Sequence, residues 1–162
     1  MFELTFPSVN KKKMFPKLLQ PKFLFVDILI LVILFVPFCF YLRAMQKALS
    51  SVSKENRKMP PTEVWITAIP VYGAIWHFFV VNAIADSLRL EFLKYNILLK
   101  NSRPTFNLGL TTSLLAAGSV IPTIGIVLFV AALVCGIIYW VQVNDCINRI
   151  ELAKRRLQAT GH

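Results

Sequence analysis

Long apolar runs separated by short charged segments dominate the pattern along this chain. One run covers residues 23–42 and contains a single charge, Asp27, and a second covers residues 64–85 without Asp, Glu, Lys or Arg. Each run is about 20 residues long, which is the length of an α-helix that crosses a bilayer. The pattern therefore predicts membrane-spanning helices at 23–42 and 64–85.

A longer uncharged run follows, from residue 104 to residue 144. As one straight helix, these roughly 40 residues would extend about 60 Å, twice the apolar thickness of a bilayer. The run must therefore fold back, and Pro122 marks the break because the residue before a proline avoids helical angles. We expect a tight hairpin of two spanning helices, 105–121 and 123–144, within an all-α integral membrane fold of four transmembrane helices.

Both of the first two helices have alternatives. A cleaved signal peptide is the rival for 23–42, but its apolar core would be about 7–15 residues long and no small-residue cleavage site follows. We therefore expect this helix to be retained. Pro70 is expected to kink the helix at 64–85, and an alternative in which this helix lies flat in the membrane interface stays open.

Small residues recur every four positions in the hairpin. This spacing lets helices approach closely in lipid. The predicted helix-packing residues are Gly109, Ser113, Ala117, Ala132 and Gly136.

Composition and charge agree with a membrane protein. The mean hydropathy is +0.62, and the net charge of +10 lies in segments beside the apolar runs. No nucleic-acid-binding motif accompanies these basic residues. Anionic phospholipid head groups are therefore the expected partner, and nucleic acid is not.

The distribution of Lys and Arg predicts the orientation. A basic arm (1–22) precedes the transmembrane domain (23–144), and a basic amphipathic tail (145–162) follows it. With the arm in the cytoplasm, thirteen of the 18 Lys and Arg residues lie on the cytoplasmic side and five lie outside, in the loop 43–59. The positive-inside rule then favours both termini in the cytoplasm.

Polar residues near the cytoplasmic ends of the helices form the candidate functional cluster. Asn82, Asp86 and Arg89 share one helix face because they are spaced by three or four residues, and Arg89 is positioned to balance an acid. Ionisable groups at membrane depth are costly, so they mark either interhelical hydrogen bonding or a substrate or proton site. The cluster comprises Asp27, Asn82, Asp86, Arg89, Gln142 and Asp145.

No residue pattern points to a reaction, a metal or a cofactor. His77 is the one histidine at membrane depth, and we interpret it as a hydrogen-bonded packing residue because haem ligation usually needs a second strong ligand. The three cysteines lack metal-ligand spacing and are interpreted as small apolar residues. We find no hydrolase or nucleotide-binding motif. The sequence therefore predicts no catalytic residue, no metal ligand and no cofactor-binding residue.

Two short motifs resemble a known group. A proline–aromatic stretch ends in the letters ADSL (Ala85–Leu88), and the letters IIYWV (Ile137–Val141) follow the hairpin. Over about residues 59–144 the chain is similar to small multi-pass bacterial membrane proteins classed as domains of unknown function. The resemblance implies a bacterial inner-membrane location and carries over no catalytic residue.

The expected function is that of a non-enzymatic accessory or assembly subunit of a larger membrane complex or homo-oligomer. Short loops, small-residue helix faces and the lack of catalytic motifs motivate this hypothesis. The alternative is a small oligomeric transporter or channel that uses the polar cluster.

Overall fold

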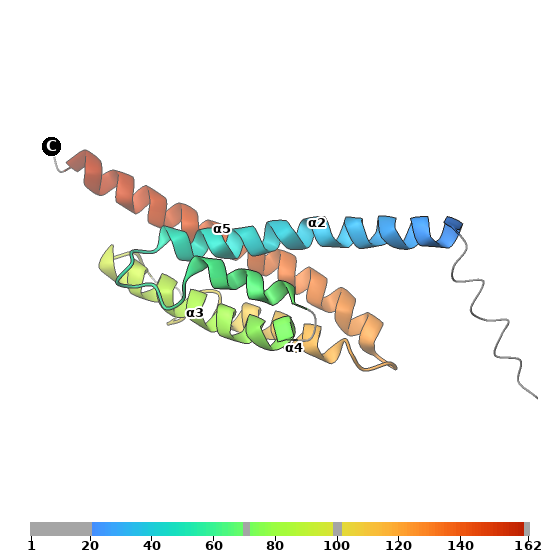
Figure 1. Cartoon of the computed structure of the whole chain (residues 1–162). Coiled ribbons are helices and arrows are strands. Elements are labelled where there is room, and N and C mark those ends of the chain that lie inside the picture. The colour runs from blue at the N-terminus through green and yellow to red at the C-terminus, as the bar shows by residue number, and fades with distance from the viewer. Residues whose placement is uncertain (1–20, 70–71, 99–101, 161–162) are drawn as a thin grey trace, which may run out of the picture. The chain divides into compact units, whose positions relative to one another are not determined.

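The computed structural model describes residues 21–69, 72–98 and 102–160, and all regular structure in these ranges is helical (Figure 1). The all-α prediction is therefore confirmed for the described residues. The elements are four α-helices and the 3-10 helix η2, in the order α2 (Pro21–Ser51), η2 (Pro61–Ala68), α3 (Tyr72–Lys94), α4 (Phe106–Gly118) and α5 (Gly125–Thr160).

The chain divides into two compact units, Met1–Cys39 and Phe40–His162. The described part of the first unit is the beginning of α2, whose apolar side chains from Phe25 to Val36 are all exposed. Pro37 lies inside α2 and removes one backbone hydrogen bond close to the division between the units. The second unit contains the rest of α2 and all the later helices.

The helix predicted at 64–85 is two elements in the structure. The 3-10 helix η2 ends at Ala68, Ile69 is extended with φ −76° and ψ 120°, and α3 begins at Tyr72. A following proline disfavours helical angles at Ile69, so Pro70 separates two helices where a kink was expected. Trp76 of α3 donates to the Glu63 carbonyl over 2.9 Å, which shows that η2 folds back against α3.

Gly73 permits this close reversal. A Cβ at this position would lie 2.0 Å from the Thr67 carbonyl oxygen, at the end of η2. No other residue fits such an approach without movement of the backbone.

The predicted hairpin between α4 and α5 is present, but its helices differ in length from the prediction. α4 is 13 residues long, or about 20 Å. α5 is 36 residues long and continues beyond residue 144 through most of the predicted tail. The charged residues after 144 therefore extend the last helix.

Four transmembrane helices are not confirmed. Two described helical stretches are long and apolar enough to cross a membrane, Phe25–Ser51 and Gly125–Ala159. α4 is too short for an apolar layer of about 30 Å, and α3 reaches the polar residues Asn82 and Asp86 about three and four turns after it begins. Among the four α-helices of the described residues, two thus meet the requirement of length and composition for a span.

The core of the second unit is built from α2, α3 and α5. Leu42, Met45, Leu49 and Val52 are at most 2% exposed, and their spacing lets one face of α2 pack along its whole C-terminal part. α3 and α5 contribute further fully buried side chains, namely Val80, Ile84, Leu88, Tyr139, Ile147 and Ile150.

The core contacts contradict the predicted placement of residues 43–59 outside and the tail inside. Lys154 of α5 donates to the Ser51 carbonyl, and Lys47 pairs with Glu151 at 3.6 Å. Glu91 of α3 accepts a hydrogen bond from Ser53 over 2.8 Å. The loop 43–59 and the ends of α3 and α5 are therefore in direct contact, whereas the prediction separated them by a bilayer.

Gly109 lets α4 approach α3 and α5 closely. A Cβ there would lie 2.6 Å from Val81 Cγ1 and 2.7 Å from Tyr139 Cε2. We expect Gly109→Val to lower the free energy of unfolding by about 1–3 kcal/mol through overpacking, measured by thermal unfolding in detergent. Ala117→Val, at an exposed position of the same helix, is the control and should change stability little. Equal effects of the two substitutions would contradict the proposed packing.

Candidate functional site at the charged end of the bundle

The charged residues of the second unit gather where α2 ends, α3 ends and the apolar part of α5 stops. We call this group the charged end. Arg57 closes the end of α2, because its guanidinium donates to the carbonyls of Leu49 over 2.8 Å and Val52 over 3.1 Å. A cation bound to the last carbonyls of a helix stabilises it. The other members are Lys47, Asp86, Glu91, Lys94, Arg103, Asp145, Arg149, Glu151 and Lys154.

Glu91 is the centre of the charged end. Its side chain is fully buried, and its two oxygens accept hydrogen bonds from Ser53 and from Asn56, each over 2.8 Å. The ammonium of Lys154 lies 3.6 Å from Oε1. One carboxylate thus joins α3, the loop after α2 and α5.

The environment of Glu91 favours the ionised form. Burial by itself opposes ionisation, but the hydrogen bonds from Asn56 and Ser53 and the charge of Lys154 outweigh it, so the pKa of Glu91 is lowered from its ordinary value of 4.5. Hydrogen bonds to a carboxylate and a nearby cation both stabilise the negative charge. Glu91 is therefore a structural anion.

A second pair ties α3 to the segment before α4. The Arg103 guanidinium donates to both oxygens of Asp86, at 2.6–2.8 Å, and to Asn82 over 2.8 Å. Its carbon Cζ lies 4.5 Å from the centre of the Phe106 ring. The planar guanidinium suits this two-oxygen contact and the stacking on a ring. Asp86 and Asn82 thus both accept hydrogen bonds from a cation of the same chain, Arg103.

The structure brings together only part of the predicted polar cluster. Asn82 and Asp86 meet, but their cation is Arg103, whereas Arg89 is exposed. Asp145 pairs with Arg149 on its own helix at 2.8 Å, and Gln142 is exposed. Asp27 is exposed in the first unit, which is described by itself, so its membership of the cluster stays a prediction.

His77 lies in a hydrogen-bonded chain between helices. Tyr41 contacts its Nε2 at 2.8 Å and Ser113 its Nδ1 at 2.6 Å. Because the Ser113 hydroxyl donates to the Gly109 carbonyl, it accepts from Nδ1, and Tyr41 donates to Nε2. A neutral imidazole satisfies all these bonds, in agreement with the predicted hydrogen-bonded packing role.

The predicted packing residues fall into two groups. Gly109, Ser113 and Ala132 are buried. A Cβ added to Gly136 would lie 3.6 Å from Thr112 Cγ2. Ala117 is exposed, so within this chain it takes no part in a buried contact.

Sequence reasoning missed Glu91 and Arg103. Glu91 had a usable signal, because it continues the apolar helical face of Ile84 and Leu88, and a charge on such a face indicates a buried partner. Arg103 had no such signal in the sequence, because it lies in a turn before α4. Its pairing depends on how the chain reverses.

These contacts support a structural clamp. Asp86, Glu91 and Asp145 of the charged end accept hydrogen bonds from within the chain, and in the described residues no group of three His, Cys, Asp or Glu side chains is arranged to hold a metal ion. The three buried side-chain oxygens without a hydrogen-bond partner in this part of the chain are the hydroxyls of Thr67, Thr105 and Tyr139.

Comparisons with family models, with curated proteins and with solved structures give no match.

Because the pKa of Glu91 is lowered on folding, its stabilising contribution is present above about pH 4.5 and is lost as the pH falls below that value. We expect Glu91→Gln to lower the free energy of unfolding by about 1–3 kcal/mol at pH 7. When the pH falls from about 5 to about 3, the variant should lose less of its free energy of unfolding than the unsubstituted chain does. Thermal unfolding in detergent across this range measures both effects.

Glu55→Gln is the matched control for this experiment. Glu55 pairs with Lys94 at 3.7 Å but its side chain is 79% exposed, so its removal should change stability by less than about 1 kcal/mol. An unchanged acid sensitivity in Glu91→Gln would contradict the role assigned to Glu91.

Proposed function

We propose that this chain is a non-enzymatic integral membrane protein that serves as an accessory or assembly subunit, in contact with a larger complex or with further copies of itself. The observation that carries the proposal is the contrast between its two kinds of surface. Polar groups of the charged end bond with one another inside the chain, whereas the apolar side chains of α2 from Phe25 to Val36 and many of those in the apolar part of α5 are exposed.

The exposed apolar surface is the first support. Just 17% of the apolar stretch of α5 is buried, and 6% of that of α2. A core helix of a soluble protein would be mostly covered, and a soluble monomer exposes few apolar patches of this extent. Lipid, or a partner's helices within lipid, covers such a surface without cost.

The charged end gives the proposed orientation. If α2 crosses the bilayer, its N-terminal arm lies on one side, and residues 43–59, 86–103 and 145–160 lie together on the other. Thirteen of the 18 Lys and Arg residues belong to this second side, which makes it cytoplasmic by the positive-inside rule. In this orientation the arm lies outside the cytoplasm. The pair η2 and α3 and the pair α4 and α5 then each enter the membrane as a hairpin from the cytoplasmic side.

The bacterial cytoplasmic membrane is the proposed location. It follows from the resemblance of residues 59–144 and agrees with the high net charge of +10, because basic segments beside apolar helices bind anionic head groups.

The transporter or channel alternative has less support. It needs polar groups that face a pathway, but Asp86 and Asn82 are held by Arg103, and the middle of the bundle is closed by Tyr139, Ile84 and Leu42. A pathway would therefore have to form between copies of the chain.

The proposed orientation predicts a labelling pattern for single cysteines in a background without Cys39, Cys135 and Cys146. Lys54→Cys and Ala159→Cys should react with a membrane-impermeant maleimide from the same side, since their segments contact Glu91 and Ser51. Ser8→Cys in the arm should react from the other side. Labelling of Lys54→Cys and Ala159→Cys from opposite sides would restore the four-span orientation.

The subunit function predicts specific contacts along α5. A photo-crosslinking residue at Val134, which is 53% exposed, should capture another membrane protein or a second copy in native membranes, whereas the same residue at Ala132, 7% exposed, should not. Gentle extraction through a C-terminal tag then identifies the captured chain. A strictly monomeric particle without crosslinks would contradict the proposal. If a homo-oligomer conducts ions and Asp86→Asn abolishes this ion flux, the channel alternative is favoured.

A further inference from the structure

Aromatic residues with polar tips gather at one level of the second unit, well away from the centre of the charged end. The chain contains three tryptophans and four tyrosines, and all of them except Tyr95 lie at this level. They come from four elements that follow one another at long intervals, α2, η2, α3 and α5. We call the following six residues the aromatic girdle: Tyr41, Trp65, Tyr72, Trp76, Tyr139 and Trp140.

Hydrogen bonds and ring contacts place the girdle residues of η2 and α3 together. The Trp76 indole donates to the Glu63 carbonyl of η2 over 2.9 Å, and its ring stacks on Tyr72 with the ring centres 5.8 Å apart. The Trp65 indole donates to the Gln46 side chain of α2 over 2.9 Å. Both indole N–H groups therefore have polar partners within the chain.

Tyr41 connects this group to α5. Its hydroxyl contacts His77, the residue after Trp76, over 2.8 Å. Its ring centre lies 6.2 Å from that of Tyr139, the residue before Trp140. The four elements therefore present their aromatic residues at the same level of the bundle.

The exposed surface changes its chemistry at the girdle. Toward the turn between α4 and α5, no charged residue is present from 104 to 144. Large apolar side chains are exposed there, namely Leu114, Val120, Ile126, Val127, Val130, Leu133, Val134 and Ile137.

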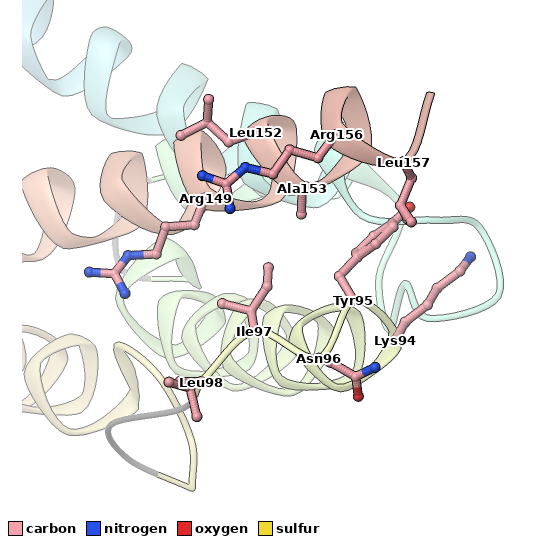
Figure 2. A pocket seen from close by; sticks show the side chains of 10 residues that line it. All are labelled: Lys94, Tyr95, Asn96, Ile97, Leu98, Arg149, Leu152, Ala153, Arg156 and Leu157. Carbon is pink, nitrogen blue, oxygen red and sulfur yellow. The ribbon is translucent and has the colours of Figure 1, made fainter. Parts of the chain in front are cut away.

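Beyond the girdle, toward the charged end, most exposed residues are polar. Figure 2 shows the far end of this side, where Lys94 and Arg149 lie. The change is sharp on α5, because Gln142 is exposed only two residues after Trp140. The exposed polar residues beyond the girdle include Arg43, Lys47, Ser50, Asn82, Arg89, Gln142, Asp145 and Asn148.

The lengths of the helices give the scale on both sides. α5 begins at Gly125, and from there to Tyr139 it rises about 20 Å. From Tyr139 onward it rises a further distance of about 20 Å to Lys154, which contacts Glu91. The apolar layer of a bilayer is about 30 Å thick. A hairpin that enters at the girdle therefore ends before the far surface.

We propose that the aromatic girdle lies among the phospholipid head groups, with the turn between α4 and α5 inserted in the apolar layer and the charged end in water. Indole and phenol rings suit this layer because the ring is apolar and the N–H or O–H group is polar. The inference rests on the membrane placement in the proposed function and specifies its boundary. It makes the second unit a wedge that enters the bilayer and returns, although α5 is long enough to cross.

The native chain carries its own probes, because all three of its tryptophans belong to the girdle. The full chain is reconstituted in dioleoyl phosphatidylcholine vesicles that carry a nitroxide quencher either on the head group or near the end of the acyl chain. We expect the head-group quencher to remove more of the tryptophan fluorescence than the deep quencher does.

Two other results would overturn the proposal. Stronger quenching by the deep nitroxide would place the girdle inside the apolar layer. Quenching by neither nitroxide would remove the girdle from the lipid boundary. Sensitivity to aqueous iodide would then place it in water, and resistance to iodide would indicate that a protein surface covers it.

Two single-tryptophan variants calibrate the depth in a background in which Trp65, Trp76 and Trp140 are replaced by phenylalanine. Phe129→Trp alters a residue that is 42% exposed on the apolar part of α5, and it should respond most to the deep quencher. Tyr95→Trp lies at the charged end (Figure 2) and should respond to iodide and to neither lipid quencher. If the background does not fold, the measurement on the native chain still decides.

The vesicles contain no partner protein, so the position of the girdle is tested separately from the subunit function. A chain that does not bind vesicles would contradict the membrane placement and the girdle position together. A bound chain with deeply quenched tryptophans would contradict the girdle position alone.

Discussion

The buried carboxylate of Glu91 is the interaction on which the second unit depends. A charge without water is tolerated only with hydrogen bonds and a counter-ion, and here Ser53, Asn56 and Lys154 supply them. These partners come from the loop after α2 and from α5, so satisfying one group fixes three segments. The same contact determines which segments lie together at the charged end.

The reversal between η2 and α3 has a comparable effect on the fold. Pro70 follows an extended Ile69, and Gly73 lets the Thr67 carbonyl approach more closely than any side chain would allow. A single long helix is thus replaced by a short helix that returns along α3. The apolar content of residues 64–85 is unchanged, but it no longer forms one continuous span. Apolar length alone therefore did not reveal this break between the two helices.

These two constraints define the proposed role. The polar groups are engaged with one another at the charged end, while α5 presents apolar side chains that lipid or a partner can cover. Such a division of surfaces fits a subunit held by lipid and neighbouring helices better than a pathway for solutes.

The sequence alone determined the helical fold, the hairpin near Pro122 and the concentration of charge beside the apolar runs, because these follow from local composition and from the limits that proline imposes. It could not decide the orientation. The arm 1–22 and the loop 43–59 each carry five Lys and Arg residues. Placing either segment on the cytoplasmic side therefore gives the same number of basic residues there. Only the tertiary contacts of Ser51, Glu91 and Lys154 place the loop 43–59 beside the tail, because ion pairs and hydrogen bonds bring together residues that lie far apart in the sequence.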